Sequence, residues 1–320
     1  DIVLSYLFGA SAVADMFFVA FRIPNFFRRL FAEGAFSQAF VPVLMQYKAK
    51  GHKELSYFLA GLSGLFGVVL IGFVALGVVF ASGLTALFAP GFIDQPEQFA
   101  ATTELVRITF PYLGFISLTA FAGSLLNAHN RFALPAFTPV MLNLCLMIAA
   151  MLALTGWFDV QPVVMVAWGV MAAGIVQLGI QLPTLSRMGL LVRPQISAKH
   201  PGVRRVGVLL IPAVLAASVG QINALVNTIL ASTLTSGSIA WLYYADRLLE
   251  LPVGLVAVAL GTVMLPHLSA MVARGDSESF KATLSWGLSL GLMLALPAAV
   301  ALYFFAQPLL AVLFMSFSGG

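Results

Sequence analysis

FRIPNFFRRLFAEGAFSQAF, residues 21–40, is the stretch on which the interpretation of the whole chain depends. It places four charged side chains in a run that is otherwise apolar: Arg22, Arg28, Arg29 and Glu33. Long hydrophobic segments lie on both sides of this run. A charge at membrane depth costs several kcal/mol unless it faces a partner or a water-filled cavity. We therefore expect this cluster to mark a functional site.

The composition indicates a polytopic membrane protein. Of the 320 residues, 61% are hydrophobic and 9% are charged, whereas a soluble domain is about half apolar and about a quarter charged. The single cysteine, Cys145, excludes a disulfide framework and a cysteine metal site. We attribute the net charge of +4 to cytoplasmic loops and not to nucleic-acid binding, because the aromatic residues lack the interleaved Lys and Arg of a nucleic-acid surface.

Hydrophobic length predicts the membrane-spanning segments, since a bilayer core of about 30 Å requires about 20 apolar residues per helix. On that rule the spans lie at residues 2–8 (a short segment), 14–48, 55–88, 99–128, 133–154, 163–185, 206–234, 239–272 and 282–305, with another from 308. The chain begins within an apolar run and ends at Phe317-Ser-Gly-Gly, so we expect an internal portion of a longer protein.

Lys and Arg residues set the orientation. They gather in alternate loops, at residues 48–53, 131, 187–205 and 274–281, which the positive-inside rule places in the cytoplasm. Five arginines are left unexplained by loops: Arg22, Arg28, Arg29, Arg107 and Arg247. Arg107 and Glu104 are i,i+3 neighbours, which favours a local pair over a site.

An internal repeat predicts the architecture. Residues 42–51 (PVLMQYKAKG) resemble residues 266–275 (PHLSAMVARG), sharing Pro, Leu, Ala, a basic residue and Gly in register. An even number of predicted crossings separates the two copies, which is typical of parallel repeats in transporters. We therefore expect an all-α polytopic membrane protein of two lobes around a central cavity, with residues 1–200 in one lobe and residues 201–320 in an incomplete second lobe.

In the predicted helix over residues 14–48, five polar side chains fall on one stripe: Asp15, Arg22, Asn25, Arg29 and Glu33. Arg28 lies off this stripe. Pro24 cannot donate a backbone hydrogen bond, so the carbonyl of Ala20 loses its helical partner and a kink is expected.

A second charged group lies in the predicted span 239–272. Tyr243, Arg247 and Glu250 share one face of the helix, as do Asp246 and Glu250. If the repeat holds, the arginines of both groups point into the same cavity, where guanidinium groups suit a phosphate or pyrophosphate. We expect the acids Asp15, Glu33 and Glu250 to pair with the arginines when no ligand is present. This pattern favours a transporter of a lipid-linked or other anionic phosphate.

Less specific interpretations stay open at this point. A straight helix over residues 14–48 would be about 50 Å long, so its arginines could instead extend to the outer surface. Asn223 and Asn227 share a helix face, where interhelical hydrogen bonding competes with a cation site. Gly61, Gly64 and Gly67 predict close helix packing. No phosphate-binding loop and no catalytic triad can be assembled, so no enzyme is expected. The four histidines lie in or near the cytoplasmic ends of the predicted spans without the spacing of metal ligands, so no metal site is expected.

The charged stretch and several later landmarks carry a family resemblance. The chain resembles the MurJ (MviN) lipid II flippases of the multidrug/oligosaccharidyl-lipid/polysaccharide (MOP) exporter superfamily, in ADMFFVAFRIPNFFRRLFAEGAFSQAFVP, NAHNRFALPAFTPVMLN, QINALVNTILAS and GSIAWLYYADRLLELPVGLVAVALGTVMLP. The resemblance extends over essentially the whole chain. It implies fourteen helices in two six-helix lobes, plus a pair that forms a lipid groove.

The resemblance also implies a function and a site. Such a protein moves undecaprenyl-pyrophosphate-linked peptidoglycan precursor from the cytoplasmic to the periplasmic leaflet by alternating access, in the cytoplasmic (inner) membrane of a bacterium. Cavity arginines would bind the pyrophosphate, with acids and an asparagine nearby. By motif these positions are Asp15, Asn25, Arg28, Arg29, Glu33, Arg247 and Glu250. Further arginines of the family's first helix and the last helices are absent from this chain.

The remaining expectations concern ions and partners. Some members of the family bind sodium near the seventh helix, and Asn227 lies at that position, so sodium is a candidate coupling ion; no other cofactor is expected. Lipid II and membrane lipids are the expected partners, with the protein a monomer that cooperates with the cell-wall synthesis machinery.

Three rival functions stay open on the residues alone. An exporter of another polyprenyl-linked oligosaccharide is excluded only by the motif match. A drug or cation antiporter of the same superfamily should prefer acids and aromatics to arginines in its cavity. A membrane enzyme acting on polyprenyl phosphates would need acids placed for metal or base work, whereas Glu54, Asp276 and Glu278 are scattered.

Overall fold

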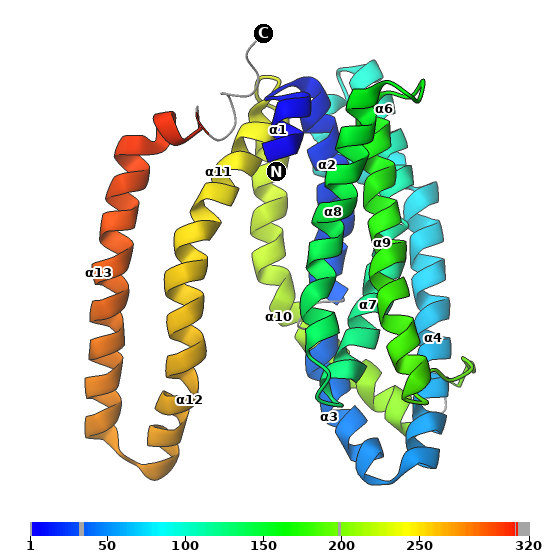
Figure 1. Ribbon diagram of the computed structural model, residues 1–320, viewed down its shortest axis with the longest axis vertical. Coiled ribbons are helices and arrows are strands. Elements are labelled where there is room, and N and C mark those ends of the chain that lie inside the picture. The colour runs from blue at the N-terminus through cyan, green and yellow to red at the C-terminus, as the bar shows by residue number, and fades with distance from the viewer. Residues whose placement is uncertain (1, 32–34, 198–199, 311, 313–320) are drawn as a thin grey trace. The chain divides into compact units, whose positions relative to one another are not determined.

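The computed structural model describes residues 2–31, 35–197, 200–310 and 312, and the regular structure of these residues is helical (Figure 1). The chain divides into two compact units. The large unit is Ala10–Ile239, and the small unit combines Asp1–Gly9 with Ala240–Gly320. The expected lobe boundary after residue 200 stays a prediction.

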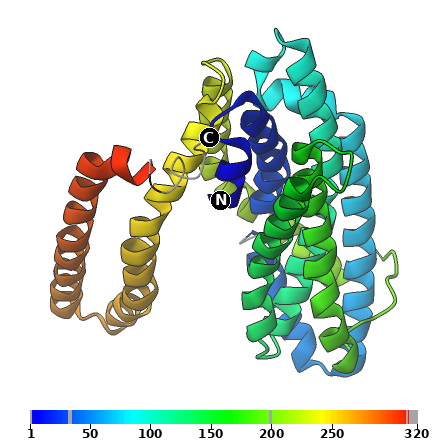
Figure 2. The ribbon, with the colours of Figure 1, turned by 45° about the horizontal axis from the view of Figure 1, so that its top comes forward.

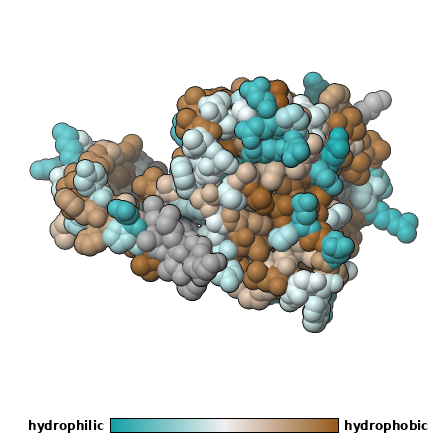
Figure 3. Space-filling view, turned by 90° about the horizontal axis from the view of Figure 1, so that it is seen from above, coloured by the Kyte–Doolittle hydropathy of each residue, from teal (hydrophilic) through white to brown (hydrophobic). Residues whose placement is uncertain are grey.

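Six helical stretches of the described residues, one of which (Pro96–Asn127) contains a turn at residues 110–111, are long and apolar enough to cross a membrane: His52–Val79, Pro96–Asn127, Ala133–Thr155, Pro162–Arg187, Pro201–Ser232 and Ser277–Leu309. Apolar side chains on them are widely exposed, with Ile71 72% and Ile211 65% exposed. An exposed apolar surface of this kind requires lipid or protein to cover it. Seen from above, hydrophilic side chains stand among hydrophobic ones at the ends of the helices (Figure 3). The prediction of an all-α polytopic membrane protein is confirmed.

The large unit is a bundle of helices joined by short connections. Its elements are α2 (Ala12–Phe31), α3 (Ala35–Ala49), α4 (His52–Val79), α5 (Ala81–Phe88), the 3-10 turn η1 (Pro90–Phe92), α6 (Pro96–Thr109), α7 (Tyr112–Asn127), α8 (Ala133–Thr155), α9 (Pro162–Arg187) and α10 (Pro201–Ser232). Helices α8 and α9 pack along each other, as both ribbon views show (Figures 1 and 2).

Three predicted spans contain interruptions that hydrophobicity did not reveal. The span over residues 99–128 divides into α6 and α7 at Pro111, which has no N–H to continue the helical hydrogen bonds. The span over 55–88 divides into α4 and α5 at Phe80. Helix α4 alone has 28 residues, and at about 1.5 Å per residue it already exceeds a core of about 30 Å. The bilayer therefore does not require the helix to continue through α5.

The third interruption lies in the small unit, which consists of α1 (Ile2–Phe8), α11 (Ser238–Pro252), the π-helical turn η2 (Val253–Val258), α12 (Ala259–Arg274) and α13 (Ser277–Leu310). The π-helical turn follows Pro252, whose missing N–H disturbs the regular ladder. Helix α13 continues through Pro308, so the prediction of a new segment from that residue is wrong. The Tyr244 hydroxyl donates to the Gly9 carbonyl at 3.2 Å and links α11 to the end of α1.

The predicted repeat has matching local geometry in the two units. Helices α3 and α12 both end beside a glycine with positive φ, Gly51 at +104° and Gly275 at +71°. Only glycine adopts this conformation at little cost. In both copies the next helix begins within two residues of that glycine, at His52 and at Ser277. The repeat is therefore a helix–glycine–helix hairpin in each unit.

Pro24 lies inside α2, and its effect on the carbonyl of Ala20 is visible in the packing. The hydroxyl of Thr109, on α6, donates to the Ala20 carbonyl at 2.8 Å. Both residues are fully buried. A neighbouring helix thus supplies the hydrogen bond that proline cannot, as membrane helices with internal prolines require. The predicted kink itself stays a prediction.

Phenylalanine rings position α3 against its neighbours. The Phe36 ring centroid lies 4.9 Å from that of Phe66 on α4, and Phe40 lies 5.1 Å from Phe121 on α7. Residues 32–34, between α2 and α3, lie outside the described residues, and Glu33 with them. The ring contacts pack α3 against α4 and α7.

The glycines of α4 serve different purposes. The prediction of close helix packing is wrong for Gly64, because a Cβ there would collide with the backbone of Gln195, in the segment between α9 and α10. Gln195 N–H donates to the Ala60 carbonyl at 2.8 Å, so the absent side chain lets this segment lie directly on α4. Around Gly67 there is open space.

Candidate functional site

Asp15 lies in the first turn of α2 and is 2% exposed. Its Oδ2 accepts a hydrogen bond from the backbone N–H of Gly237 at 2.6 Å. Gly237 has φ +93°, and a Cβ there would meet the carbonyl oxygen of Ala10 at 2.8 Å, so glycine is required. Asp15 therefore fixes the turn after α10 to the start of α2. Its expected pairing with an arginine stays a prediction.

Arg22 reaches from α2 to α10. Its Nη1 donates to the hydroxyl of Thr228 at 2.7 Å, and Thr228 in turn donates to the Ala224 carbonyl at 2.7 Å. Thr228 is fully buried and Arg22 is half-buried. The partner on α10 lies more than 200 positions away in sequence, and no pattern in the sequence indicated it.

Asn25 orients Arg28. The amide Nδ2 of Asn25 donates to the Phe21 carbonyl at 2.9 Å, and its Oδ1 accepts from Arg28 Nε at 3.0 Å. Since Asn25 donates with its nitrogen, its oxygen is the atom left to accept from the guanidinium group. Asn25 thus contacts Arg28 directly, although the predicted stripe placed Asn25 with Arg22 and Arg29 and left Arg28 off it.

Arg28 lines a polar cavity inside the large unit, with a volume of about 460 Å³. The walls come from α2, α3, α7, α8 and α9: Arg28, Ser37, Tyr112, Ile116, Thr119, Ala120, Gly123, Ser124, Asn127, Pro135, Thr138, Pro139, Leu142, Gln177 and Gln181. Arg28 lies off the predicted stripe and nevertheless faces a cavity. Arg29, on the stripe, is exposed.

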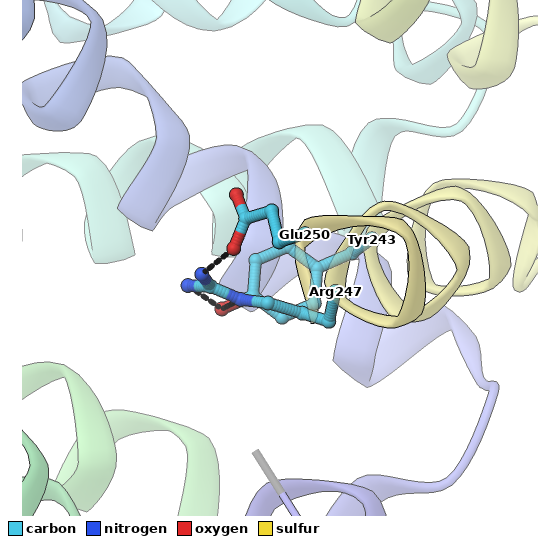
Figure 4. Close-up of polar contacts among 3 residues, drawn as sticks. All are labelled: Tyr243, Arg247 and Glu250. Atoms are coloured by element: carbon cyan, nitrogen blue, oxygen red, sulfur yellow. Dashed lines mark hydrogen bonds and ion pairs between the residues drawn. The ribbon is translucent and has the colours of Figure 1, made fainter. Parts of the chain in front are cut away.

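The second charged group occupies α11, in the small unit (Figure 4). Arg247 Nη1 lies 2.7 Å from Glu250 Oε2, and Arg247 Nε and Nη2 donate to the Tyr243 hydroxyl at 3.3 and 3.0 Å. The Arg247 guanidinium carbon lies 5.1 Å from the centre of the Tyr243 ring. The predicted shared face and the predicted Arg247–Glu250 pair are confirmed. Glu250 therefore balances the charge of Arg247 within the same helix.

Two other predicted site residues are exposed. Asp246 is exposed on α11, and Asn227 is exposed on α10. The convergence of Arg247 with Arg22, Arg28 and Arg29 on one cavity stays a prediction. Among the residues that the structure describes, no group of three or more His, Cys, Asp or Glu side chains is placed to hold a metal ion.

Sequence reasoning missed the glutamines of the polar cavity. Gln177 and Gln181 lie on α9 within an apolar span, and each is 1% exposed. Their i,i+4 spacing puts them on one helix face. Uncharged polar residues four apart in a spanning segment were the available signal.

The comparisons with known proteins give consistent results. A family model described as lipid II flippase MurJ matches residues 4–318. The probable lipid II flippase MurJ of Vibrio cholerae serotype O1 is 45% identical over 327 residues, and that of Buchnera aphidicola subsp. Acyrthosiphon pisum is 41% identical over 315 residues. The lipid II flippase MurJ of Burkholderia cenocepacia is 42% identical over 319 residues. Each alignment covers 98% of this chain and 61% of the relative, so the chain spans about three fifths of their length.

A solved structure gives the same result in three dimensions. The structure of "Lipid II flippase MurJ, inward closed conformation" superposes with a TM-score of 0.81 at 29% sequence identity. The match covers 98% of this chain and 64% of that one. The helical arrangement described above is therefore shared with that flippase, and the predicted MOP-type transporter fold is confirmed.

Proposed function

Because this chain belongs to the MurJ lipid II flippase family, we propose that the protein, at the full length of its relatives, moves lipid II from the cytoplasmic to the periplasmic leaflet. The observation that carries the proposal is Arg28, held by Asn25 at the wall of a polar cavity inside a membrane-spanning bundle. Guanidinium groups bind phosphate oxygens through paired, charge-assisted hydrogen bonds, and lipid II offers a pyrophosphate.

The mechanism we propose uses binding and movement. Guanidinium groups attract the pyrophosphate from the cytoplasmic side and hold its oxygens by charge-assisted hydrogen bonds. Arg247 is hydrogen-bonded to the Tyr243 hydroxyl and paired with the Glu250 carboxylate. When the substrate binds, the phosphate replaces the Glu250 carboxylate as the partner of Arg247. Rocking of one lobe against the other then re-exposes the site, as in other repeat-based transporters. The role of the family is transport, and we propose that no covalent bond is made or broken.

The setting follows from the same proposal. The protein is a multi-pass membrane protein, and we propose the cytoplasmic membrane of a bacterium as its location. We propose that it acts as a monomer alongside the cell-wall synthesis machinery and without a cofactor. Sodium at Asn227 is the coupling ion to test.

Complementation tests the function. The variants Arg28→Ala and Arg247→Ala are made in a version of this protein that has the full length of its relatives. Each variant should reach normal levels in the membrane but fail to support growth when the wild-type flippase is depleted. Loss of one charge-assisted hydrogen bond should weaken lipid II binding about 10- to 100-fold. Arg131→Ala, in an exposed loop, is the matched control and should support growth.

The result that would refute the proposal is full growth of both arginine variants. Retained growth with transport of a different polyprenyl-linked sugar in reconstituted vesicles would instead favour the exporter of another oligosaccharide. Release of phosphate from lipid II by the purified protein would favour a membrane enzyme.

A further inference from the structure

The polar cavity beside Arg28 contains more than a charge. Hydroxyl and amide side chains dominate its polar wall: Ser37, Thr119, Ser124, Asn127, Thr138, Gln177 and Gln181. Arg28 is the one charged side chain among the described residues that line it. Its volume of about 460 Å³ lies within the range of about 300–1,000 Å³ that is common for small-molecule sites.

The hydrogen bonds of this wall fix which way the two glutamines face. Gln177 Nε2 donates to the Thr138 carbonyl at 3.0 Å, and a carbonyl oxygen can only accept. The Thr138 hydroxyl donates to the Leu134 carbonyl at 2.9 Å, so it accepts from Gln181 Nε2 at 2.8 Å. Flipping either amide would place two acceptors against each other or leave a donor without a partner. Both amide nitrogens are therefore committed to Thr138.

The two amide oxygens are consequently left over. Gln177 Oε1 and Gln181 Oε1 are buried and have no hydrogen-bond partner. Buried acceptors without donors are costly and rare in native proteins, and such groups usually await a ligand or an ordered water. Gln181 Oε1 lies 3.7 Å from the position that a Cβ would occupy on Gly123, another residue of the cavity wall.

The chemistry of the wall selects the kind of ligand. Two unpartnered carbonyl oxygens could accept from a hydroxyl or amide N–H group, or could coordinate a cation. Arg28 on the same cavity makes the cation unfavourable, because a positive charge already occupies the wall. A neutral donor group attached to an anion satisfies both features, since the anion goes to Arg28 and the donors go to the glutamines.

We propose that Gln177 and Gln181 form a subsite for the neutral hydrogen-bond donors of the transported headgroup, its sugar hydroxyls and amide N–H groups, next to the phosphate held by Arg28. This inference rests on the proposed function and goes beyond it. The arginines provide attraction to any polyprenyl pyrophosphate, whereas the glutamines distinguish a pyrophosphate that carries a sugar from one that does not.

Two variants address the subsite in different ways. Gln181→Met keeps the length of the side chain and removes the amide. Gly123→Ala leaves every hydrogen bond of the wall in place and puts a methyl group over Gln181 Oε1; its nearest neighbour, Pro135 Cβ at 3.4 Å, is an ordinary contact. Gln161→Met, at the exposed start of the same helix and without a side-chain cap bond, is the matched control.

The experiment measures the affinity of the purified full-length flippase for lipid II and for undecaprenyl pyrophosphate, which lacks the sugars and the peptide. Gln181→Met and Gly123→Ala should each weaken lipid II binding about 3- to 10-fold, the effect of one hydrogen bond, and leave undecaprenyl pyrophosphate binding unchanged. Arg28→Ala should weaken binding of both lipids. The Gln161→Met control should match the wild type for both.

The outcomes separate the subsite from the function. Unchanged lipid II affinity in both subsite variants, with the wild type still binding lipid II, overturns the subsite and leaves the flippase proposal intact; the glutamines then hold water only. An equal loss for both lipids also overturns the subsite, because it indicates a structural role. A wild-type protein that binds neither lipid contradicts the proposed function itself. Size-exclusion profiles identify a Gln181→Met protein that fails to fold, and Gly123→Ala then decides.

Discussion

The hydrogen bond from Thr109 to Ala20 offers a sharp test of how α2 tolerates its internal proline. Pro24 has no N–H for the Ala20 carbonyl, and the Thr109 hydroxyl on α6 occupies that position at 2.8 Å. Thr109→Val replaces the hydroxyl with a methyl group of similar size. The packing is preserved, but the carbonyl loses its donor in a fully buried place.

The magnitude follows from that burial. Leaving a buried acceptor without its donor costs about 1–3 kcal/mol. For a unit of this size each kcal/mol lowers the midpoint of thermal unfolding, Tm, by about 2–4 °C. We therefore expect a decrease in Tm of at least about 2 °C for purified Thr109→Val protein in detergent. Thr155→Val is the matched control, because the Thr155 hydroxyl is exposed and water can replace it.

A double-mutant cycle isolates the role of the proline. Pro24→Ala restores an N–H that can donate to the Ala20 carbonyl within α2. The Thr109→Val substitution should then cost less than half as much in the Pro24→Ala background as in the wild type. Equal costs in the two backgrounds, or a Tm decrease no larger than that of Thr155→Val, would refute the reasoning.

Two further predictions concern the segment that covers α4 and the start of α10. Gly64→Ala should lower Tm because its methyl group collides with the backbone of Gln195. Gly67→Ala places its methyl group in open space and should leave Tm unchanged or raise it, since alanine favours helix by up to about 1 kcal/mol. Equal shifts of Tm in the two variants would contradict the close approach of Gln195 to Gly64. Burial holds the pKa of His200 below its ordinary value of 6.5, although Glu54 opposes the shift, and the His200 Nδ1 accepts from Gly202 N–H at 3.1 Å. Because the unfolded chain takes up this proton more readily, the stability contributed by neutral His200 is present above pH 6.5 and is lost as the pH falls towards the folded pKa. Tm measured between about pH 5 and pH 8 should decrease on acidification. His200→Asn keeps a capping acceptor and should reduce this dependence of Tm on pH. An unaltered pH dependence in the His200→Asn protein would argue against the role of His200.

Much of the charged site could be predicted because the relevant residues are close in sequence. Tyr243, Arg247 and Glu250 are three and four residues apart, so helical geometry alone puts their side chains in contact. The same rule fails for Arg28. Its contact with Asn25 is an i,i+3 pair, but Arg28 lies off the stripe predicted for one long helix, and the cavity that it faces has walls supplied by four other helices.

Helix interruptions could be predicted only in part. Hydrophobicity averaged over about 20 residues detects a span but does not detect a break within it, so the division at Pro111 and the π-helical turn after Pro252 escaped it. Pro24 shows the converse, since the helix continues through it. At Pro24 a neighbouring helix supplies the missing donor, which the sequence around the proline does not reveal.

The sequence by itself determined that the protein lies in a membrane, that its secondary structure is helical and which family it belongs to. A chain that is 61% hydrophobic and 9% charged must satisfy its backbone within helices in a membrane, and local motifs identify its relatives. Only the tertiary structure decided which groups on different helices hydrogen-bond to one another. Examples are Thr109 with Ala20, Arg22 with Thr228, and Thr138 with the two glutamines. Each of these contacts joins two different helices. A hydrogen bond requires its atoms within about 3 Å, a precision that helix packing sets and sequence spacing does not.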